Sequence, residues 1–224
     1  MPVYQLPSEY IFPDPNEAED GLIAVGGDLS PIRLLTAYSC GIFPWFNPDE
    51  EILWWSPNPR LVLFPEDIKI SKSLLRIIKS KKFTVKLDTN FSNVIKQCKN
   101  ICRKDADGTW ITDDMEQAYI ELHRIGAAHS VEIYENNELV GGLYGVSIGK
   151  GFFGESMFSI KPNASKIALV YLANYLKALN FHFIDAQVPT DHLISMGAKE
   201  ISRKDFLTLL DKALDNDSKI GSWY

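Results

Sequence analysis

The spacing of apolar residues changes near residue 129, and this change constrains the fold more than any other feature of the chain. From there to residue 158 apolar side chains recur at every second position, as in strands, with turns at Asn136-Asn137 and at Gly149–Gly151. A clean helical stripe then runs over residues 163–179, and a further strand is predicted over residues 181–187. We therefore predict an α/β (α+β) domain with a mixed, mostly antiparallel sheet.

The first sixty residues differ from the rest because they are irregular and rich in Pro, Gly and Trp. Leu61–Phe64 is predicted to be the first strand of the larger part. We therefore divide the chain into a small N-terminal domain, residues 1–62, and a second domain, residues 63–224. Three strands, a helix and a strand in succession are typical of the acetyltransferase-like (GNAT-like) fold, a likeness that does not fix a function. The tail after residue 214 shows no pattern, and we expect it to be loose.

Charge is distributed unevenly along this acidic chain. The net charge of −6 argues against a general nucleic-acid binder, because neutralising phosphates requires local Lys and Arg. Residues 68–82 nevertheless form a predicted helix, capped by Ser71 or Ser73. Its basic residues are three and four positions apart, which places them on one helical face. This basic face and the lysines that extend it are Lys69, Lys72, Arg76, Lys79, Lys81 and Lys82. Such a run is often only a solvated face, but a single sign of charge in an acidic protein also fits an anionic partner.

The sequence carries no pattern of a membrane, secreted or metal-binding protein. No apolar run approaches the roughly 20 residues of a membrane span, and the N-terminus lacks a secretory signal. Cys40, Cys98 and Cys102 do not have the spacing of zinc ligands. We therefore expect a cytoplasmic protein with reduced thiols and with no metal or membrane partner. We also expect a monomer, although no sequence pattern bears on the oligomeric state.

Polar residues occur on two predicted strands that the fold should place side by side. Glu155 and Ser156 stand near the end of the strand before the long helix, and Asp185 and Gln187 lie on the strand after it. Because Asp185 and Gln187 are two positions apart, we expect their side chains on one face. An acid and an amide across from Glu155 suit proton handling at a carbonyl that an amine attacks. The alternative is that these residues only satisfy buried backbone groups or face solvent.

Two other chemistries fit the sequence less well. An acetyl-CoA enzyme needs a glycine-rich phosphate loop at the start of the long helix, whereas residues 159–165 contain no glycine and Pro162 removes one donor. A Ser-His-Asp hydrolase would use His192, which lies close in sequence to Asp185 and Asp191, yet no Gly-x-Ser-x-Gly elbow is present. We therefore expect an acyl donor other than CoA, and no cofactor.

Motifs spread over nearly the whole chain form a joint pattern that is more specific than any one of them. They are Gly21–Ser30, Gly41–Phe46, Trp54–Pro57, Gly108–Ile111, Gly141–Gly145, Gly154–Ser159, Asn163–Lys166 and Ile184–Gln187. With these motifs the chain resembles the leucyl/phenylalanyl-tRNA–protein transferase family. Enzymes of this family add Leu or Phe from aminoacyl-tRNA to proteins that begin with Arg or Lys.

The resemblance implies roles for the site residues. Gln187 would orient the attacking amine, and Asp185 would draw off its proton, directly or through Gln187. Glu155, with Ser156 beside it, would bind the α-amino group of the donor amino acid. An apolar pocket for the donor side chain would be lined by Trp45, Trp110, Leu143, Phe152, Leu169, Leu176 and Ile184. Burying an unbranched-at-Cβ side chain such as Leu, Phe or Met, worth roughly 1.5–3 kcal/mol, would help to select the donor.

The resemblance also implies the partners. The basic face would hold the acceptor stem of tRNA through phosphate contacts, and modified proteins would be degraded by the N-degron pathway. Cys40 and Phe153 stand where the family commonly has a basic and a smaller residue, which leaves one tRNA contact and the pocket shape open. An acetyl-CoA-dependent N-acetyltransferase and a non-catalytic tRNA-binding module remain the alternative functions.

Overall fold

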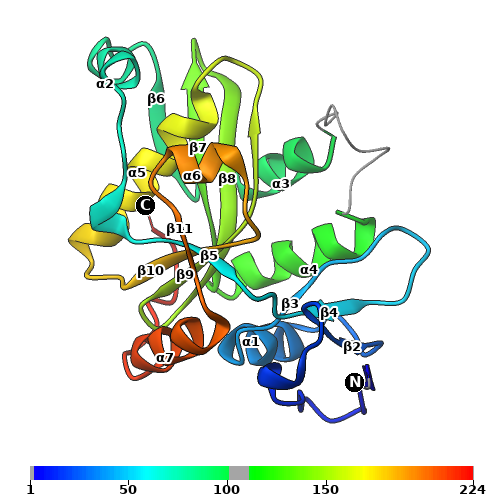
Figure 1. Cartoon of the computed structure of the whole chain (residues 1–224). Coiled ribbons are helices and arrows are strands. Elements are labelled where there is room, and N and C mark those ends of the chain that lie inside the picture. Colours follow the sequence, from blue (N-terminus) through cyan, green and yellow to red (C-terminus); the bar gives the residue numbers. More distant parts are fainter. Residues whose placement is uncertain (1–2, 101–110, 224) are drawn as a thin grey trace.

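The fold is organised around a seven-stranded sheet with the order β11-β5-β10-β9-β8-β7-β6 (Figure 1). A computed structural model describes residues 3–100 and 111–223 of the chain. Within the sheet β10 runs parallel to β9, and the other neighbouring strands pair antiparallel, so the predicted mixed, mostly antiparallel sheet is confirmed. Its strands are β5 (Arg60–Leu63), β6 (Thr84–Leu87), β7 (Ala128–Glu135), β8 (Glu138–Ile148), β9 (Gly151–Ser159), β10 (Phe183–Gln187) and β11 (Lys199–Ile201).

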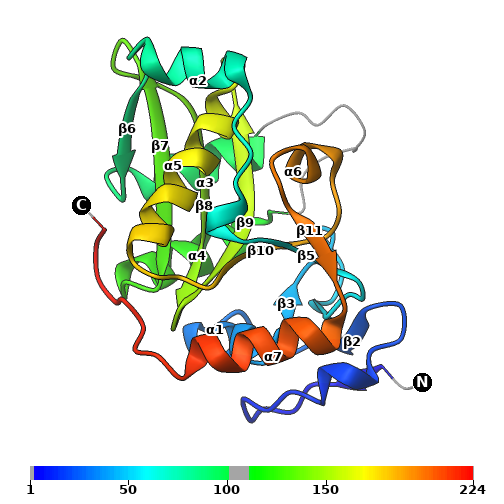
Figure 2. The same ribbon diagram turned by 60° about the vertical axis from the view of Figure 1, so that its left-hand side comes forward.

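Helices cover both faces of this sheet (Figures 1 and 2). One face packs against α5 (Ala164–Ala178) and α2 (Lys72–Lys79). The other packs against four helices: α1 (Pro31–Ser39), α3 (Phe91–Asn100), α4 (Asp113–Arg124) and α7 (Arg203–Leu214). A short helix, α6 (Asp191–Ser195), follows β10. The succession β7, β8, β9, α5, β10 is the predicted order of an acetyltransferase-like core.

The N-terminal residues form a second, smaller sheet with the order β1-β2-β4-β3. Its strands are β1 (Tyr4–Gln5), β2 (Leu22–Val25), β3 (Phe43–Pro44) and β4 (Leu53–Trp55). Two single-turn helices complete this part of the chain: η1 (Pro15–Glu17) comes before β2, and η2 (Pro65–Asp67) follows β5. Buried side chains of α1 join the same core cluster as Phe183 and Phe206 of the large sheet and α7. The division at residue 62 stays a prediction.

Local sequence signals account for the hairpin and the helix that frame the site. Asn136 and Asn137 both adopt positive φ angles, 52° and 66°, as the tight turn between β7 and β8 requires. Gly141 of β8 lies against α5, where an added Cβ would meet the Cβ of Ala164 at 2.4 Å. The glycine therefore lets α5 pack closely across the strand.

Two expectations from the sequence are wrong. The basic helix runs over Lys72–Lys79 and not over residues 68–82. The predicted cap at Ser71 is confirmed, since Ser71 Oγ accepts a hydrogen bond from Leu74 N at 3.2 Å. Lys69 lies before the helix and therefore does not share its face. The tail is not loose, since Trp223 is 5% exposed, stacks on His129 at 3.8 Å between ring centroids and donates its backbone N–H to Asp88.

Candidate active site

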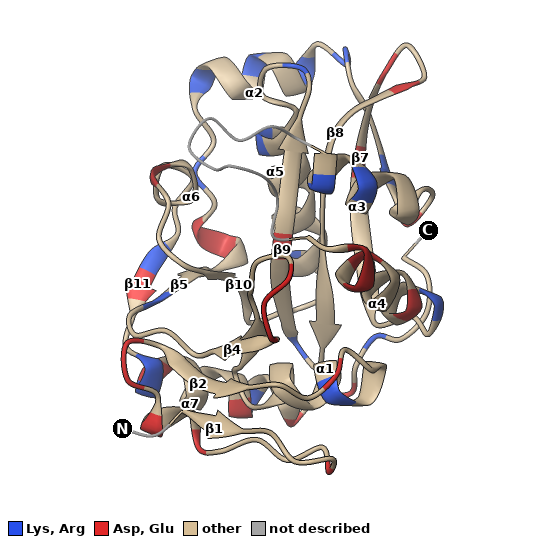
Figure 3. Ribbon diagram, turned by 90° about the vertical axis from the view of Figure 1, so that its right-hand side faces the viewer, with Lys and Arg blue, Asp and Glu red and all other residues tan. Residues whose placement is uncertain are grey.

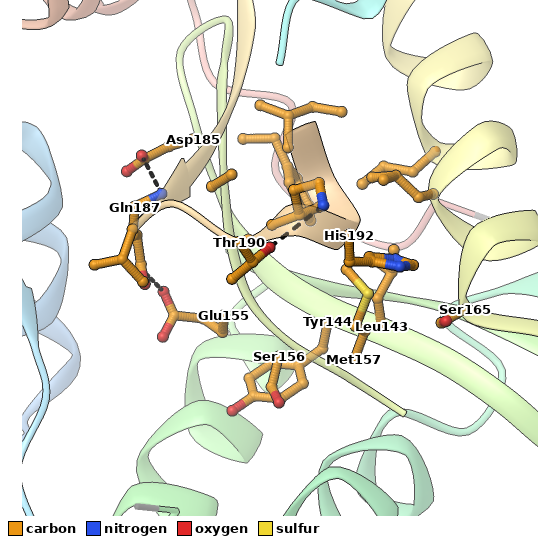
Figure 4. Close-up of a pocket in the computed structure, with 18 of the residues that line it drawn as sticks. Leu143, Tyr144, Glu155, Ser156, Met157, Ser165, Asp185, Gln187, Thr190 and His192 are labelled. Atoms are coloured by element: carbon orange, nitrogen blue, oxygen red, sulfur yellow. Dashed lines mark hydrogen bonds between the residues drawn. The ribbon is translucent and has the colours of Figure 1, made fainter. Parts of the chain in front are cut away.

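A cavity of about 500 Å³ lies where β9 and β10 separate. The parallel pairing of these strands reaches Phe153 and Asp185 and goes no further. Beyond this point Gly154–Ser159 of β9 and residues 186–188 line the cavity from opposite sides. Residues of β3, β8, α5 and α6 complete the wall. The cavity that opens between the two strands is therefore lined by residues from several elements (Figure 4).

The cavity wall is mostly apolar, and five of the seven side chains expected to line it do so. These are Trp45, Leu143, Phe152, Leu169 and Ile184. Ile184 and Phe152 are register partners on neighbouring strands and therefore face the same side. Leu176 is fully buried but lies outside the cavity lining, and Trp110 falls outside the described residues. Trp45, at 44% exposure, stands at the rim.

Glu155 is the centre of the polar end of the cavity. Its Oε1 accepts hydrogen bonds from Tyr38 Oη at 2.7 Å and from Gln187 Nε2 at 3.0 Å. Its Oε2 accepts one from Tyr119 Oη at 2.8 Å, and the two tyrosine hydroxyls also contact each other. Burial raises the pKa of Glu155 to about 7, although these three donors favour the charged form. The cavity therefore contains a carboxyl group able to change protonation near neutral pH.

Asp185 is fully buried and paired with Arg60. Arg60 Nε lies 2.8 Å from Oδ1, and Nη2 lies 2.6 Å from Oδ2, a two-pronged pairing of guanidinium and carboxylate. Oδ1 also accepts the backbone N–H of Gln187 at 2.9 Å. Both oxygens are thus bonded inside the protein, and this geometry favours an action of Asp185 through Gln187 over direct contact with an amine proton.

Gln187 links the two carboxylates. The register of β10 shifts between Asp185 and Gln187, and Gln187 has a φ of 62°, a left-handed conformation that costs energy for a side chain other than glycine. Its backbone bonds to Asp185 while its side-chain amide bonds to Glu155. Figure 4 shows Glu155, Asp185 and Gln187 together, away from Leu143, Ser165 and His192. The predicted meeting of the two strands' polar groups is therefore observed, whereas their catalytic roles stay predictions.

Several residues of the site were missed from the sequence. Tyr38 and Tyr119 lie on α1 and α4 and reach Glu155 across 117 and 36 positions of the chain. Arg60 lies 125 positions from Asp185. A contact over such a distance leaves no local pattern in the sequence, so none of these three partners could be assigned from its neighbours. One signal pointed to the two tyrosines: both Tyr38 and Tyr119 lie on the apolar, inward-facing side of their predicted helices.

His192 lines the cavity without joining a catalytic triad. Its Nε2 is buried and has no hydrogen-bond partner among the described residues, and burial lowers the pKa of the ring. Asp185, one of the two acids close to His192 in the sequence, is paired with Arg60 instead. The arrangement therefore does not favour Ser-His-Asp hydrolysis.

The start of α5 is poorly suited to a pyrophosphate. Asn163 precedes the helix with a φ of 71°. Of the first helical N–H groups, that of Ala164 donates to Lys161 O at 3.1 Å and that of Ser165 to Ser159 Oγ at 3.4 Å. Donors that an acetyl-CoA enzyme would aim at phosphate are already bonded within the chain. This agrees with the glycine-free sequence of the segment.

The predicted tRNA-binding residues lie away from the cavity lining. Lys72, Arg76 and Lys79 are on α2, at one end of the molecule in Figure 3. Lys81 and Lys82 follow the helix, and Lys82 pairs with Glu135 at 3.0 Å. The basic face therefore consists of α2 and the residues after it, with Lys69 as an outlying neighbour.

Residues 3–100 and 111–223 contain neither a cluster of metal ligands nor a membrane-spanning helix. In these ranges no three or more His, Cys, Asp or Glu side chains come together as metal ligands. No helix there has the length and apolarity needed to cross a membrane.

Known proteins resemble the chain over its full length. The sequence profile described as "Leucyl/phenylalanyl-tRNA protein transferase" matches residues 62–211, and the profile of that family's N-terminal domain matches residues 27–58. The leucyl/phenylalanyl-tRNA–protein transferase of an Anaeromyxobacter species is 53% identical, over 100% of this chain and 95% of that protein. The enzyme of the same name from Syntrophus aciditrophicus is also 53% identical, over 100% of this chain and 94% of that protein.

The similarity to solved structures is more distant. A GCN5-related N-acetyltransferase from Kribbella flavida aligns with a TM-score of 0.39 and 10% identity, over 77% of this chain and 61% of that one. Sequence identity over the whole length, and not this alignment, decides the relationship. The chain belongs to the leucyl/phenylalanyl-tRNA protein transferase family.

Proposed function

We propose that this protein transfers Leu, Phe or Met from aminoacyl-tRNA to the α-amino group of proteins that begin with Arg or Lys. Its family makes it an aminoacyltransferase that uses aminoacyl-tRNA and a protein substrate. The observation that carries the proposal is the cavity itself, whose apolar wall ends at the hydrogen-bonded pair of Glu155 and Gln187. Such a cavity suits an amino acid that has an apolar side chain and a reactive polar end.

The donor side chain enters the apolar part of the cavity, between Leu143, Leu169 and Ile184. Its burial contributes roughly 1.5–3 kcal/mol for Leu, Phe or Met. Polar donors would lose hydrogen bonds to water there, and small donors would leave unfilled space. The α-amino group and the ester carbonyl of the donor then lie at the polar end, where Glu155 binds the amino group.

The transfer step requires placement more than activation, because the ester of aminoacyl-tRNA is already reactive. The acceptor nitrogen forms a bond to the ester carbonyl carbon, and the bond from that carbon to the ribose oxygen breaks. The amine gives up a proton, and the released ribose oxygen takes one. Gln187 orients the amine for this attack. Asp185 acts through Gln187, since Gln187 N is bonded to its Oδ1.

The basic face supplies the contact to the body of the tRNA. Lys72, Arg76 and Lys79 present positive charge from α2 in a protein whose net charge is −6. Contacts of this kind neutralise phosphates without reading bases, so they tolerate tRNAs of different sequence. The protein acts as a monomer in the cytoplasm, and the proteins it modifies enter the N-degron pathway of degradation.

A transfer assay with panels of donors and acceptors tests the proposal. The wild-type protein is incubated with tRNA charged with Leu, Phe, Met or Val, and with peptides that differ only in a first residue of Arg, Lys or Ala. We expect mass spectrometry to find one added Leu, Phe or Met on the Arg and Lys peptides only. Equal transfer to the Ala peptide would refute the acceptor specificity, and transfer of Val at the rate of Leu would refute the role of the apolar cavity.

A further inference from the structure

Arg60 is the buried partner of Asp185 and has no other assigned role. It is the first residue of β5 and only 1% of its surface is exposed. The guanidinium lies over two aromatic rings, with Cζ at 4.7 Å from the ring centre of Phe43 and at 4.5 Å from that of Phe206. Phe43 belongs to the small N-terminal sheet and Phe206 to α7. Three separate parts of the fold therefore fix one side chain.

The hydrogen bonds of Arg60 are directed at Asp185. Nε and Nη2 both bond to the carboxylate, whereas Nη1 has no partner among the described residues. If the planar guanidinium rotated, it would lose both hydrogen bonds to the Asp185 carboxylate. Asp185 is consequently held in one position, with a compensating charge beside it.

The fixed carboxylate in turn determines the backbone of Gln187. The same oxygen that accepts Arg60 Nε, Oδ1, also accepts Gln187 N at 2.9 Å. This bond holds Gln187 in its left-handed conformation, and that conformation directs the side-chain amide to Glu155 at 3.0 Å. A chain of contacts therefore runs from Arg60 through Asp185 and Gln187 to the polar end of the cavity.

We propose that Arg60 is a positioning residue for aminoacyl transfer, which fixes Asp185 so that Gln187 is held ready to orient the attacking amine. The inference rests on the proposed function. Arg60 itself lies outside the cavity lining and does not touch the substrate. Its effect is therefore expected on the rate of transfer, with little effect on the binding of aminoacyl-tRNA.

Arg60→Lys keeps the charge and removes the two-pronged geometry. We expect the maximal rate of single-turnover transfer to fall about tenfold or more, while the Kd for Leu-tRNA changes less than about threefold. The matched control is Arg33→Lys, because Arg33 is also 1% exposed and is paired with Asp28 in the N-terminal part. This control should lower the thermal unfolding temperature and leave the transfer rate unchanged.

A double-mutant cycle separates positioning from a merely structural role. If Arg60 acts through Gln187, Arg60→Lys has no further effect on the rate in a Gln187→Ala background. Equal fold losses in both backgrounds, or an unchanged rate in the single variant, would overturn the inference. A wild-type protein without transfer would overturn the proposed function and this inference together, whereas an active wild type with equal losses overturns only the role of Arg60.

A second set of variants covers the case in which Arg60→Lys does not fold. Arg60→Met combined with Asp185→Leu removes the buried pair as a unit and keeps its approximate volume, a replacement that often preserves stability. We expect this protein to fold, to bind Leu-tRNA and to transfer as slowly as the same protein with Gln187→Ala added. A wild-type rate from the charge-free pair would contradict the positioning role.

Discussion

Replacing Glu155 by Gln should change how stability depends on pH. In the folded protein burial raises the pKa of this carboxyl from its ordinary value of 4.5 to about 7. Folding therefore favours the protonated, neutral form of the Glu155 carboxyl. The stability that this preference contributes is fully present below pH 4.5. That contribution is lost as the pH rises through about 7, because the folded protein must then hold a buried charge.

The size of the effect follows from the same pKa. A pKa difference of one corresponds to about 1.4 kcal/mol. Between the ordinary value of 4.5 and about 7, the free energy of unfolding of the wild type should lose on the order of 3 kcal/mol relative to a variant without the charge. Glu155→Gln keeps an oxygen that can accept from Tyr38 or Gln187, so most of the hydrogen bonding survives.

Urea unfolding between pH 4.5 and pH 8, followed by the fluorescence of the five tryptophans, measures this difference. We expect the free energy of unfolding of Glu155→Gln to gain on the wild type between pH 4.5 and about 7, by about 3 kcal/mol in total, and the difference to level off toward pH 8. Glu66→Gln, at an exposed glutamate, is the control for the loss of one carboxylate and should follow the wild type within about 0.5 kcal/mol. Parallel curves for Glu155→Gln and the wild type would refute the electrostatic account of the site.

Three further predictions address the tRNA contact, the cavity and the tail. Lys72→Glu with Arg76→Glu should weaken tRNA binding and lower the slope of log K against log salt by about 2, as measured by filter binding, because two phosphate contacts are lost. Leu169→Ala removes a buried side chain from the cavity wall and so enlarges the cavity. It should cost about 2–5 kcal/mol of stability and, because the larger Phe side chain then fits better, raise the use of Phe-tRNA relative to Leu-tRNA in direct competition. Trp223→Ala removes the ring stacked on His129 and should cost about 3–5 kcal/mol in urea unfolding, with no change in the transfer rate per folded molecule.

The elements with strong local signals could be predicted from the sequence. The hairpin at Asn136-Asn137, the helix α5 and the strand β10 follow from turn chemistry and from a clear change of period. Strand order then brings Glu155 close to Gln187, because β9 and β10, which precede and follow α5 in the sequence, are neighbours in the sheet. A resemblance over the whole chain also pointed to the correct family.

The parts that could not be predicted depend on contacts between distant segments. Arg60 reaches Asp185, and Tyr38 reaches Glu155, only after the N-terminal sheet and α1 pack on the large sheet. No periodicity marks such a residue, since its neighbours in sequence are unrelated to its partner. Trp223 was missed for the same reason, because a single aromatic residue fixes the tail by stacking on His129.

The most direct test of the central claim compares transfer with tRNA binding in Gln187→Ala. Both are measured on the same preparations, transfer as formation of a leucyl peptide from Leu-tRNA and an Arg-starting peptide, and binding as the Kd for Leu-tRNA. We expect the wild type to form the product, and the variant to bind Leu-tRNA within about threefold of the wild type while its transfer rate falls about 100-fold or more. A variant that transfers at the wild-type rate, or a wild type that binds Leu-tRNA without forming product, would contradict the account.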